Sequence, residues 1–299
     1  MADRWIIETI DLRKSYDGIE AVRGLNLQVP PGSICGFLGR NGAGKTTAIK
    51  VLLGMAHPTS GQARVFGLDA SNAGASLEIR RRTGFVAEEK ALYGSMDVAG
   101  LIRFTAAFYP TWRRDLEQRY RQTFDLPLDR KVKDLSKGMR TKTALLLALC
   151  RGAELLVLDE PTSGLDPAAI EEVLQALVAH VSGEETTVFF SSHQIAEVDQ
   201  IADRVAIIDR GQTVVQGALD DLRRRFQRIQ LVFDDDAPDA SFHAPGVERL
   251  RRKGRVLTIL SSAGAEAVIE EARALNPISI DVAPVTLKEI FLETVATEN

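Results

Sequence analysis

The sequence predicts an α/β fold built around a phosphate-binding loop, and three observations support this prediction. Apolar segments typical of buried parallel strands alternate with segments of helical periodicity. One such strand leads directly into the sequence Gly-Arg-Asn-Gly-Ala-Gly-Lys-Thr-Thr at residues 39–47. Another, at residues 155–158, is followed at once by the carboxylates of Asp159 and Glu160. Because open α/β sheets bind ligands at the carboxyl ends of their strands, we expect the functional residues to gather there.

The composition is that of an ordinary globular protein of 299 residues, with 45% hydrophobic and 26% charged residues. This length suits one large domain or a main domain with a smaller one. A net charge of −4 argues against nucleic acid as the main partner. Two cysteines, Cys35 and Cys150, are too few for a disulfide framework. Neither a signal-peptide pattern nor a membrane-spanning apolar stretch is visible, so we expect a cytoplasmic protein.

The loop at residues 39–47 fits the pattern G-x-x-x-x-G-K-[ST], with an apolar strand before it and a helical apolar face after it. Its glycines allow successive N–H groups to point at phosphate oxygens, and the helix dipole adds to the attraction. The alternative, a glycine turn with a surface lysine, does not explain these flanks. We expect Lys45 to reach the β- and γ-phosphates and the Thr46 hydroxyl to hold Mg²⁺. The expected nucleotide-binding residues of the loop are Gly39, Arg40, Asn41, Gly42, Ala43, Gly44, Lys45, Thr46 and Thr47.

Around the loop, the sequence predicts strands at residues 5–12 and 21–29, with a connection at 13–20 that holds Tyr16. Tyr16 could stack on a purine or be a partly buried loop tyrosine, and spacing alone leaves both open. A helical insertion is expected to begin with Asp97 as an N-cap and to separate strands of one sheet. The remaining expected elements are strands at 63–66, 83–87, 186–190, 205–208 and 213–215, and helices at 77–82, 98–109, 112–124, 140–150 and 167–181.

The carboxylates after the strand at residues 155–158 suit the chemistry of phosphate hydrolysis. Asp159 is expected to order Mg²⁺. Successive strand residues point to opposite faces, so Glu160 is free to polarise the water that attacks the γ-phosphate. Such general-base catalysis is worth a factor of about 10²–10⁴ in rate. His193, at the end of the next strand, could contact the γ-phosphate and this water, or could be satisfied by a backbone carbonyl.

The composition changes near residue 222, where a basic run is followed by an acidic one. We therefore expect two domains, at residues 1–222 and 223–299. The second reads as a small α+β domain, for which regulation or dimer contact is our hypothesis. Its expected elements are strands at 228–233, 256–260 and 278–283 and helices at 263–275 and 287–295. A basic run at 251–253 is expected on a solvated face.

The combined motifs resemble the ATP-binding cassette (ABC) ATPases over about the first 220 residues. In chain order they are the phosphate loop, Leu135-Ser-Lys-Gly-Met139, the strand ending in Asp159-Glu160, Ser163-Gly-Leu-Asp166, and His193. The resemblance implies a P-loop NTPase cassette with a β subdomain and a helical subdomain, followed by the small C-terminal domain.

The same resemblance implies a division of roles between two cassettes. Ser136 and Gly138 would form the signature loop, which binds the γ-phosphate of ATP held by a second ABC ATPase subunit. Two cassettes, identical or different, would pair head to tail around two ATP molecules. Asp166 would communicate between the two sites, and Tyr16 falls where the family stacks an aromatic ring on adenine.

Two positions depart from the family pattern. Glu88 stands where the family usually has glutamine, and its carboxylate could approach Mg²⁺ or the attacking water. Lys137 and Met139 replace the usual glycine and glutamine of the signature. Lys137 adds a positive charge that favours a triphosphate, while Ser136 and Gly138 keep the expected phosphate contacts.

The resemblance implies the ATPase subunit of a transporter, attached to an integral-membrane permease at the inner face of the cell membrane. Residues 286–293 resemble the branch that serves separately encoded export permeases. Residues 97–135, with Glu88 as a hinge, are expected to carry the docking surface. The alternative is a soluble ABC ATPase acting on ribosomes or DNA, but one cassette and no sustained heptad run argue against it. A P-loop kinase or GTPase lacks support, because Asp159 with Glu160 suits ATP hydrolysis by water.

Overall fold

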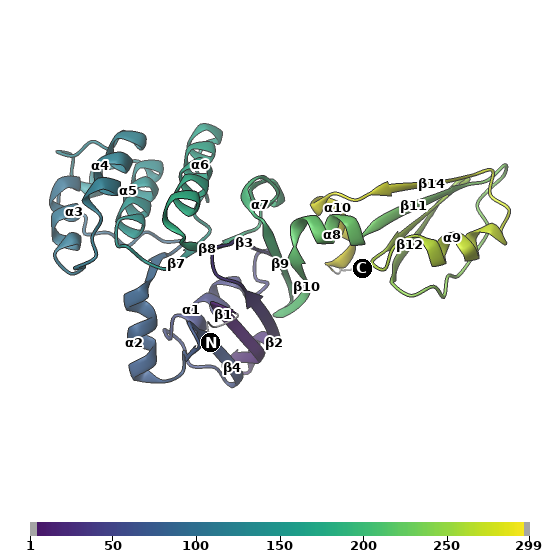
Figure 1. Cartoon of the computed structure of the whole chain (residues 1–299), viewed down its shortest axis with the longest axis horizontal. Coiled ribbons are helices and arrows are strands. Elements are labelled where there is room, and N and C mark those ends of the chain that lie inside the picture. Colours follow the sequence, from purple (N-terminus) through teal and green to yellow (C-terminus); the bar gives the residue numbers. More distant parts are fainter. Residues whose placement is uncertain (1–4, 296–299) are drawn as a thin grey trace. The chain divides into compact units, whose positions relative to one another are not determined.

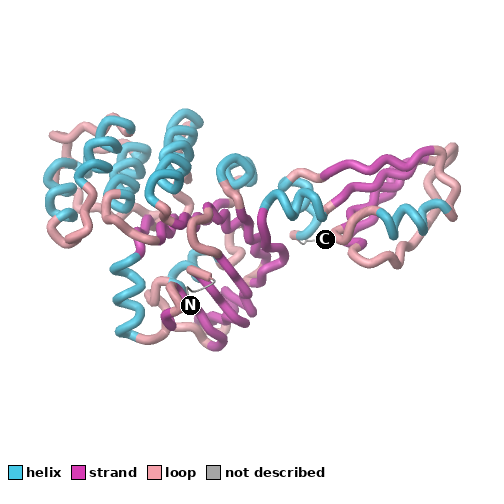
Figure 2. Tube along the Cα trace, viewed as in Figure 1, coloured by secondary structure: helices cyan, strands magenta, loops and turns pink. Residues whose placement is uncertain are grey.

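The computed structural model describes residues 5–295 and divides into two compact units, Met1–Thr213 and Val214–Asn299. The functional division expected between residues 222 and 223 stays a prediction. Figure 1 labels the elements of both units, and Figure 2 distinguishes helices from strands by colour. Each unit has its own apolar core.

The first unit contains two sheets, joined to helices. Its strands are β1 (Ile7–Tyr16), β2 (Ile19–Val29), β3 (Ile34–Leu38), β4 (Ser60–Val65), β5 (Leu68–Asp69), β6 (Thr83–Val86), β7 (Leu155–Asp159), β8 (Thr187–Ser192), β9 (Arg204–Asp209) and β10 (Gln212–Ala218), the last of which continues into the second unit. Its helices are α1 (Lys45–Leu52), α2 (Ala73–Arg82), α3 (Val98–Ala106), α4 (Arg114–Thr123), the 3-10 helix η1 (Val132–Asp134), α5 (Lys137–Leu149), α6 (Pro167–Glu184) and α7 (Ile195–Ile201).

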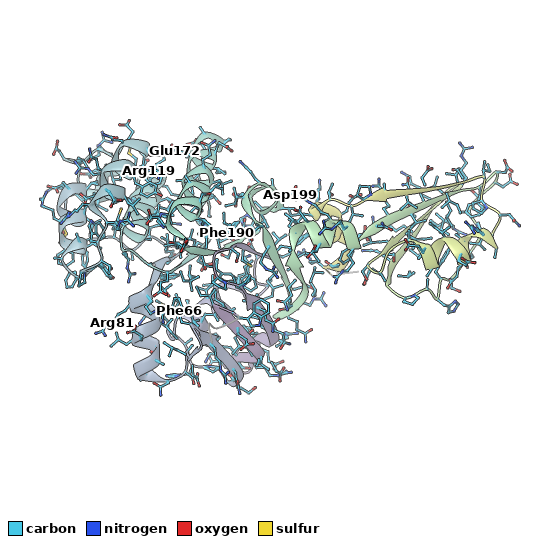
Figure 3. The ribbon with its side chains drawn as sticks, in the orientation of Figure 1. Phe66, Arg81, Arg119, Glu172, Phe190 and Asp199 are labelled. Carbon is cyan, nitrogen blue, oxygen red and sulfur yellow. The ribbon has the colours of Figure 1, made fainter. Side chains whose placement is uncertain are left out.

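The central sheet has the strand order β10-β9-β3-β8-β7-β6, and β3 runs parallel to its neighbours β8 and β9. The register pairs Leu38 with Ser192 and Asp159 with Ser191. The carboxyl ends of β3, β7 and β8 therefore meet at one edge, as the sequence predicts. Phe190, labelled in Figure 3, lies fully buried in β8 just before this edge.

A second, antiparallel sheet of order β2-β1-β4-β5 packs with β3 and α1 around one apolar core. In this core the rings of Phe37 and Phe189 lie 5.2 Å apart between centroids. The helices α3 and α4 pack against α5, which in turn contacts α6, and Figure 1 shows this group beside the central sheet. The expected β subdomain and helical subdomain are therefore both present.

The second unit is an antiparallel sheet of order β12-β13-β11-β14 with helices against it. Val268 and Ala272 of its helix α9 pack on Ile229 and Leu231 of β11, as part of its apolar core. Its elements are α8 (Leu219–Arg225), β11 (Gln227–Val232), β12 (Val247–Lys253), β13 (Val256–Ser261), α9 (Glu266–Arg273), β14 (Ser279–Pro284) and α10 (Leu287–Thr294).

The connection expected at residues 13–20 is wrong, because β1 extends to Tyr16 and β2 begins at Ile19. Asp17 and Gly18 form the turn between them, with φ of 48° and 82°. Positive φ at both positions is the geometry of a two-residue hairpin turn, for which Asp-Gly is a preferred sequence. Tyr16 consequently lies at a strand end, where it is 44% exposed.

Other differences are smaller. The helix expected at 140–150 begins three residues earlier, because the Ser136 side chain caps it by accepting a hydrogen bond from the Met139 N–H. The helix expected at 98–109 is capped by Asp97 as predicted but ends at Ala106. The elements α7, α8 and β12 are not anticipated, since the two helices are short and the sequence of β12 is dominated by arginine.

The close packing of α7 on β3 provides a test of this fold. A Cβ added to Gly36 would overlap one γ-methyl group of the buried Val198 and crowd the other. We predict that Gly36→Ala lowers the free energy of unfolding by about 1–3 kcal/mol, the usual cost of overpacking a core. Thermal or urea unfolding measures this change.

Gly183 of α6 is the matched control, because a Cβ there meets no atom within 4 Å. Gly183→Ala should leave stability unchanged or raise it by up to about 1 kcal/mol through better helix propensity. Equal stability of the two variants would contradict the close contact between α7 and β3.

Candidate nucleotide site

A cavity of about 520 Å³ lies at the carboxyl edge of the central sheet. It brings together residues from the phosphate loop, from the ends of β7 and β8, and from the segment after β6. Its volume lies in the range of cofactor and ligand pockets. The lining residues are Ala21, Asn41, Gly42, Ala43, Gly44, Lys45, Thr46, Thr47, Glu88, Glu160, Ser163 and His193.

The phosphate loop has the backbone geometry that anion binding requires. Gly42 and Gly44 have φ of 79° and 104°, in the region where a side chain is disfavoured. A Cβ at Gly44 would also overlap the carbonyl oxygen of Ala21. Gly44 immediately precedes α1, so the unpaired N–H groups and the positive dipole end of this helix lie at the cavity. The loop is therefore a ready-made phosphate site.

Lys45 is held at the centre of this loop. Its Nζ donates hydrogen bonds to the carbonyl oxygens of Gly39 at 2.8 Å and Arg40 at 3.3 Å. It also forms an ion pair with Glu160, in which Nζ lies 3.2 Å from Oε1, and both side chains are only 7% exposed. A phosphate oxygen reached by this ammonium would take the place of the Glu160 carboxylate.

Glu160 is the point where the polar groups of the site converge. It follows β7 with φ of 48°, and its N–H donates to the Ser191 hydroxyl at 2.9 Å. The same hydroxyl donates to Oδ1 of Asp159 at 2.6 Å. On the side chain, Oε2 lies 2.8 Å from Nδ1 of His193. The Glu160 carboxylate is thus placed between a lysine and a histidine inside the cavity, whereas Asp159 is 2% exposed and bonded to Ser191.

The oxygen donors of the site fit a Mg²⁺ ion. Thr46 and Glu88 line the cavity, and Asp159 lies at the adjoining strand end. Among residues 5–295, no three His, Cys, Asp or Glu side chains gather as a metal site. Mg²⁺ is usually bound through one or two protein oxygens together with substrate phosphates, so this sparse donor set suits it.

Several expected residues lie outside the cavity of their own chain. The structure places Ser136 and Asp166 at the N-caps of α5 and α6, where their side chains accept from the N–H groups of Met139 and Ala169. Tyr16 does not line the cavity, and the ammonium of Lys14 lies 4.6 Å from its ring centroid. The other expected residues outside the cavity lining are Gly39, Arg40, Gly138 and Asp159.

The structure also adds residues to the expected nucleotide site. Ala21 and Ser163 line the cavity, and Ser191 links Asp159 to Glu160. Lys90 donates hydrogen bonds to the carbonyl oxygens of Glu88 and Glu160, and burial, followed by the nearby Lys137 charge, lowers its pKa. Ser191 is 32 residues from Asp159 and Lys90 is 70 residues from Glu160, so no local sequence pattern points to either contact.

The comparisons agree with this geometry. Residues 22–163 match the family model described as ABC transporter. The chain is 32% identical to the bacitracin transport ATP-binding protein BcrA of Bacillus licheniformis, over 96% of this chain and 95% of that protein. It is 36% identical to the daunorubicin/doxorubicin resistance ATP-binding protein DrrA of Streptomyces peucetius, over 73% of this chain and 66% of that protein.

Among solved structures, the ATP-binding subunit of an ABC transporter superposes with a TM-score of 0.66 at 27% identity. The match covers 73% of this chain and 92% of that chain. The chain therefore belongs to the ABC transporter family, as an ATP-binding subunit that hydrolyses ATP to drive transport. The expected α/β cassette is confirmed, and the comparisons do not favour an ATPase acting on ribosomes or DNA. In residues 5–295 no helix has the length and apolarity needed to cross a bilayer.

The Ser191 hydroxyl generates a prediction about this site. Ser191→Ala removes the acceptor of the Glu160 N–H and the donor to Asp159, both of them buried. We expect the kcat for ATP hydrolysis to fall about tenfold, or about 1.4 kcal/mol, because two hydrogen bonds worth about 0.5–1.5 kcal/mol each are lost from the active geometry.

Steady-state hydrolysis and thermal unfolding would be measured together on this variant. Ser182→Ala is the control, since the exposed Ser182 hydroxyl only bonds the Val178 carbonyl of its own helix. An unchanged kcat in Ser191→Ala would show that the hydroxyl does not orient the two carboxylates.

Proposed function

We propose that two copies of this cassette, or one copy and a related cassette, close around two MgATP and drive a separate membrane permease. The observation that carries this proposal is the position of Ser136. Its side chain is exposed at the N-terminus of α5, and it does not line the cavity that contains Lys45. The N-terminus of this 13-residue helix suits a phosphate oxygen. A second subunit is therefore needed to supply such a group to the Lys45 site.

The proposed hydrolysis uses the groups around Glu160. Lys45 exchanges the Glu160 carboxylate for the β- and γ-phosphate oxygens. The freed carboxylate accepts the proton of a water aimed at the γ-phosphate, and His193 holds that carboxylate and the transferred phosphate in line. Thr46, Asp159 and Glu88 would hold Mg²⁺, which neutralises phosphate charge when bound. Tyr16 supplies the ring for adenine, and Asp166 lies where the two sites meet.

An exposed aromatic group suits the permease contact. It consists of Tyr93, Phe104 and Phe108, whose rings pack edge to face with centroids 5.5 and 5.1 Å apart. Phe108 is 65% exposed and Tyr93 60%. An exposed cluster of large apolar rings marks an interaction site more often than isolated apolar residues do.

A groove of about 290 Å³ lies on the same helical part of the unit and involves the segment after Glu88. It is lined by Phe85, Val86, Ala87, Glu89, Lys90, Ala91, Leu92, Thr105, Tyr109, Ala144, Leu147, Ala148 and Arg151. We propose that a cytoplasmic helix of the permease docks on this groove and the aromatic group. The chain would then be peripheral at the inner face of the cell membrane. The names of the bacitracin and daunorubicin relatives favour export as the direction.

The role of Glu160 leads to a prediction about hydrolysis. Glu160→Gln should bind MgATP with similar affinity but hydrolyse it at least about a hundredfold more slowly, because the amide cannot accept the proton. The bound triphosphate should then persist and produce a dimer on size-exclusion chromatography.

Glu78→Gln is the control, since Glu78 is an exposed carboxylate of α2 outside the cavity. Hydrolysis by Glu160→Gln at the parental rate would contradict the water-activating role. A monomer with MgATP bound and hydrolysis blocked, both alone and with the permease, would contradict the proposed dimer.

The aromatic group provides a separate test of the permease contact. Phe108→Ser removes the most exposed ring of the group and should lower recovery of the copurifying polytopic membrane protein several-fold, because a buried Phe contributes about 1.5–3 kcal/mol. The measurement is affinity purification of the tagged chain from solubilised membranes.

Ile10→Ser is the matched control, since Ile10 is a 48% exposed apolar residue of β1, outside this group. Equal recovery with both variants would move the docking surface elsewhere.

A further inference from the structure

We infer that Lys90 is a positioning residue for ATP hydrolysis, whose ammonium joins the Glu88 segment to the backbone of Glu160 and so directs the Glu160 carboxylate. This inference rests on the proposed role of Glu160. Lys90 does not line the nucleotide cavity, so it acts through Glu160 and not on the nucleotide.

The hydrogen bonds of Lys90 define the link. Its Nζ donates to the carbonyl oxygen of Glu88 at 2.9 Å and to that of Glu160 at 3.4 Å. The Glu160 carbonyl also accepts from the Ser163 N–H at 3.2 Å. A carbonyl oxygen has two lone pairs, so these two donors together satisfy it. A single ammonium therefore connects two segments that are 70 residues apart in sequence.

This link acts on a residue with an unusual backbone. Glu160 has φ of 48°, a conformation that non-glycine residues rarely adopt and that persists only when neighbouring groups hold it. Its N–H is held by the Ser191 hydroxyl, and its carbonyl by Ser163 and Lys90. Because the side chain direction follows from this backbone, loss of one holder lets the carboxylate turn away from His193.

Lys90 also lines the groove proposed for the permease, as do Leu92 and Tyr109. The same residue therefore lines the groove and donates to the Glu160 carbonyl with its ammonium. A helix that fills the groove would meet Lys90 and shift the position of its ammonium. Lys90 thus provides a direct physical connection between the docking groove and the carboxylate that activates water.

A competing explanation is that Lys90 only balances the negative charge of Glu88. The hydrogen bond, however, goes to the backbone carbonyl of Glu88, which a change of its side chain leaves in place. The two explanations therefore differ in a Glu88→Gln background. If Lys90 only balances charge, Lys90→Met loses its effect there; if Lys90 positions Glu160, the effect remains.

The test measures MgATP hydrolysis by variants of the full chain. The single variants are Lys90→Met, Lys90→Arg, Glu88→Gln and Glu160→Gln, and the double variant combines Glu88→Gln with Lys90→Met. We expect Lys90→Met to lower kcat about tenfold with KM within about twofold, since the charge-assisted hydrogen bond to the Glu160 carbonyl is lost outside the nucleotide cavity. Lys90→Arg should recover most of kcat, because a guanidinium can also donate to both carbonyls. Lys253→Met, at an exposed lysine of the second unit, is the control.

The outcomes separate the inference from the function on which it rests. A tenfold loss of kcat in Lys90→Met that persists in the Glu88→Gln background supports positioning, provided that the thermal unfolding midpoint is retained. An unchanged kcat, an increase in KM alone, or an effect that disappears with Glu88→Gln overturns it. If Lys90→Met does not fold, Lys90→Gln replaces it, because its shorter, uncharged amide cannot bridge both carbonyls. A fall in kcat at parental KM that persists with Glu88→Gln supports positioning, and an unchanged kcat or a raised KM alone overturns it. Parental hydrolysis by Glu160→Gln would instead reject the role of Glu160 itself.

Discussion

The site depends on the backbone conformation of one residue, Glu160. A left-handed conformation at a non-glycine residue costs about 1–2 kcal/mol, and here the groups that stabilise it come from β8, from the turn after β7 and from Lys90. The conformation ends the strand and turns the carboxylate toward Lys45 and His193. This strained backbone therefore holds the negative charge of the Glu160 carboxylate inside the cavity, between Lys45 and His193.

The parallel register of the central sheet makes this arrangement possible. The pairing of Asp159 with Ser191 sets one hydroxyl between two successive carboxylates, which have different surroundings as a result. Asp159 is hydrogen-bonded to that hydroxyl and almost fully buried. Glu160 lines the cavity and contacts Lys45 and His193. The two adjacent carboxylates therefore differ in environment, as the roles proposed for them require.

The sequence predicts the parts of this fold that depend on local patterns. The phosphate loop, the strand before Asp159 and the cap at Asp97 all follow from residues close together in the chain. The hairpin at Asp17 could also have been predicted from Asp-Gly, although the polar residues of β1 obscure the strand.

The remaining features depend on contacts between distant residues. Neither the bond from Ser191 to Asp159 nor that from Lys90 to Glu160 leaves a local pattern, because each joins elements that meet only after folding. The strand β12 also cannot be predicted from a local pattern, because its arginines are typical of a solvated loop. In the structure, Arg249 and Arg251 form ion pairs with Glu293. Pairing across a fold lets charged residues occupy a strand that composition alone would assign to a loop.

The cap of α5 restricts which residue can stand at position 136. Aspartate, asparagine, serine and threonine all cap helices well, because each offers an oxygen to the first free N–H groups. The Ser136 oxygen accepts the Met139 N–H, yet its hydroxyl still has a proton to donate. A carboxylate at this position would preserve the helix and repel an approaching anion, so stability alone does not distinguish aspartate from serine. A serine hydroxyl can both cap the start of the helix and offer a proton to an anion that approaches it, which the carboxylate of aspartate cannot do.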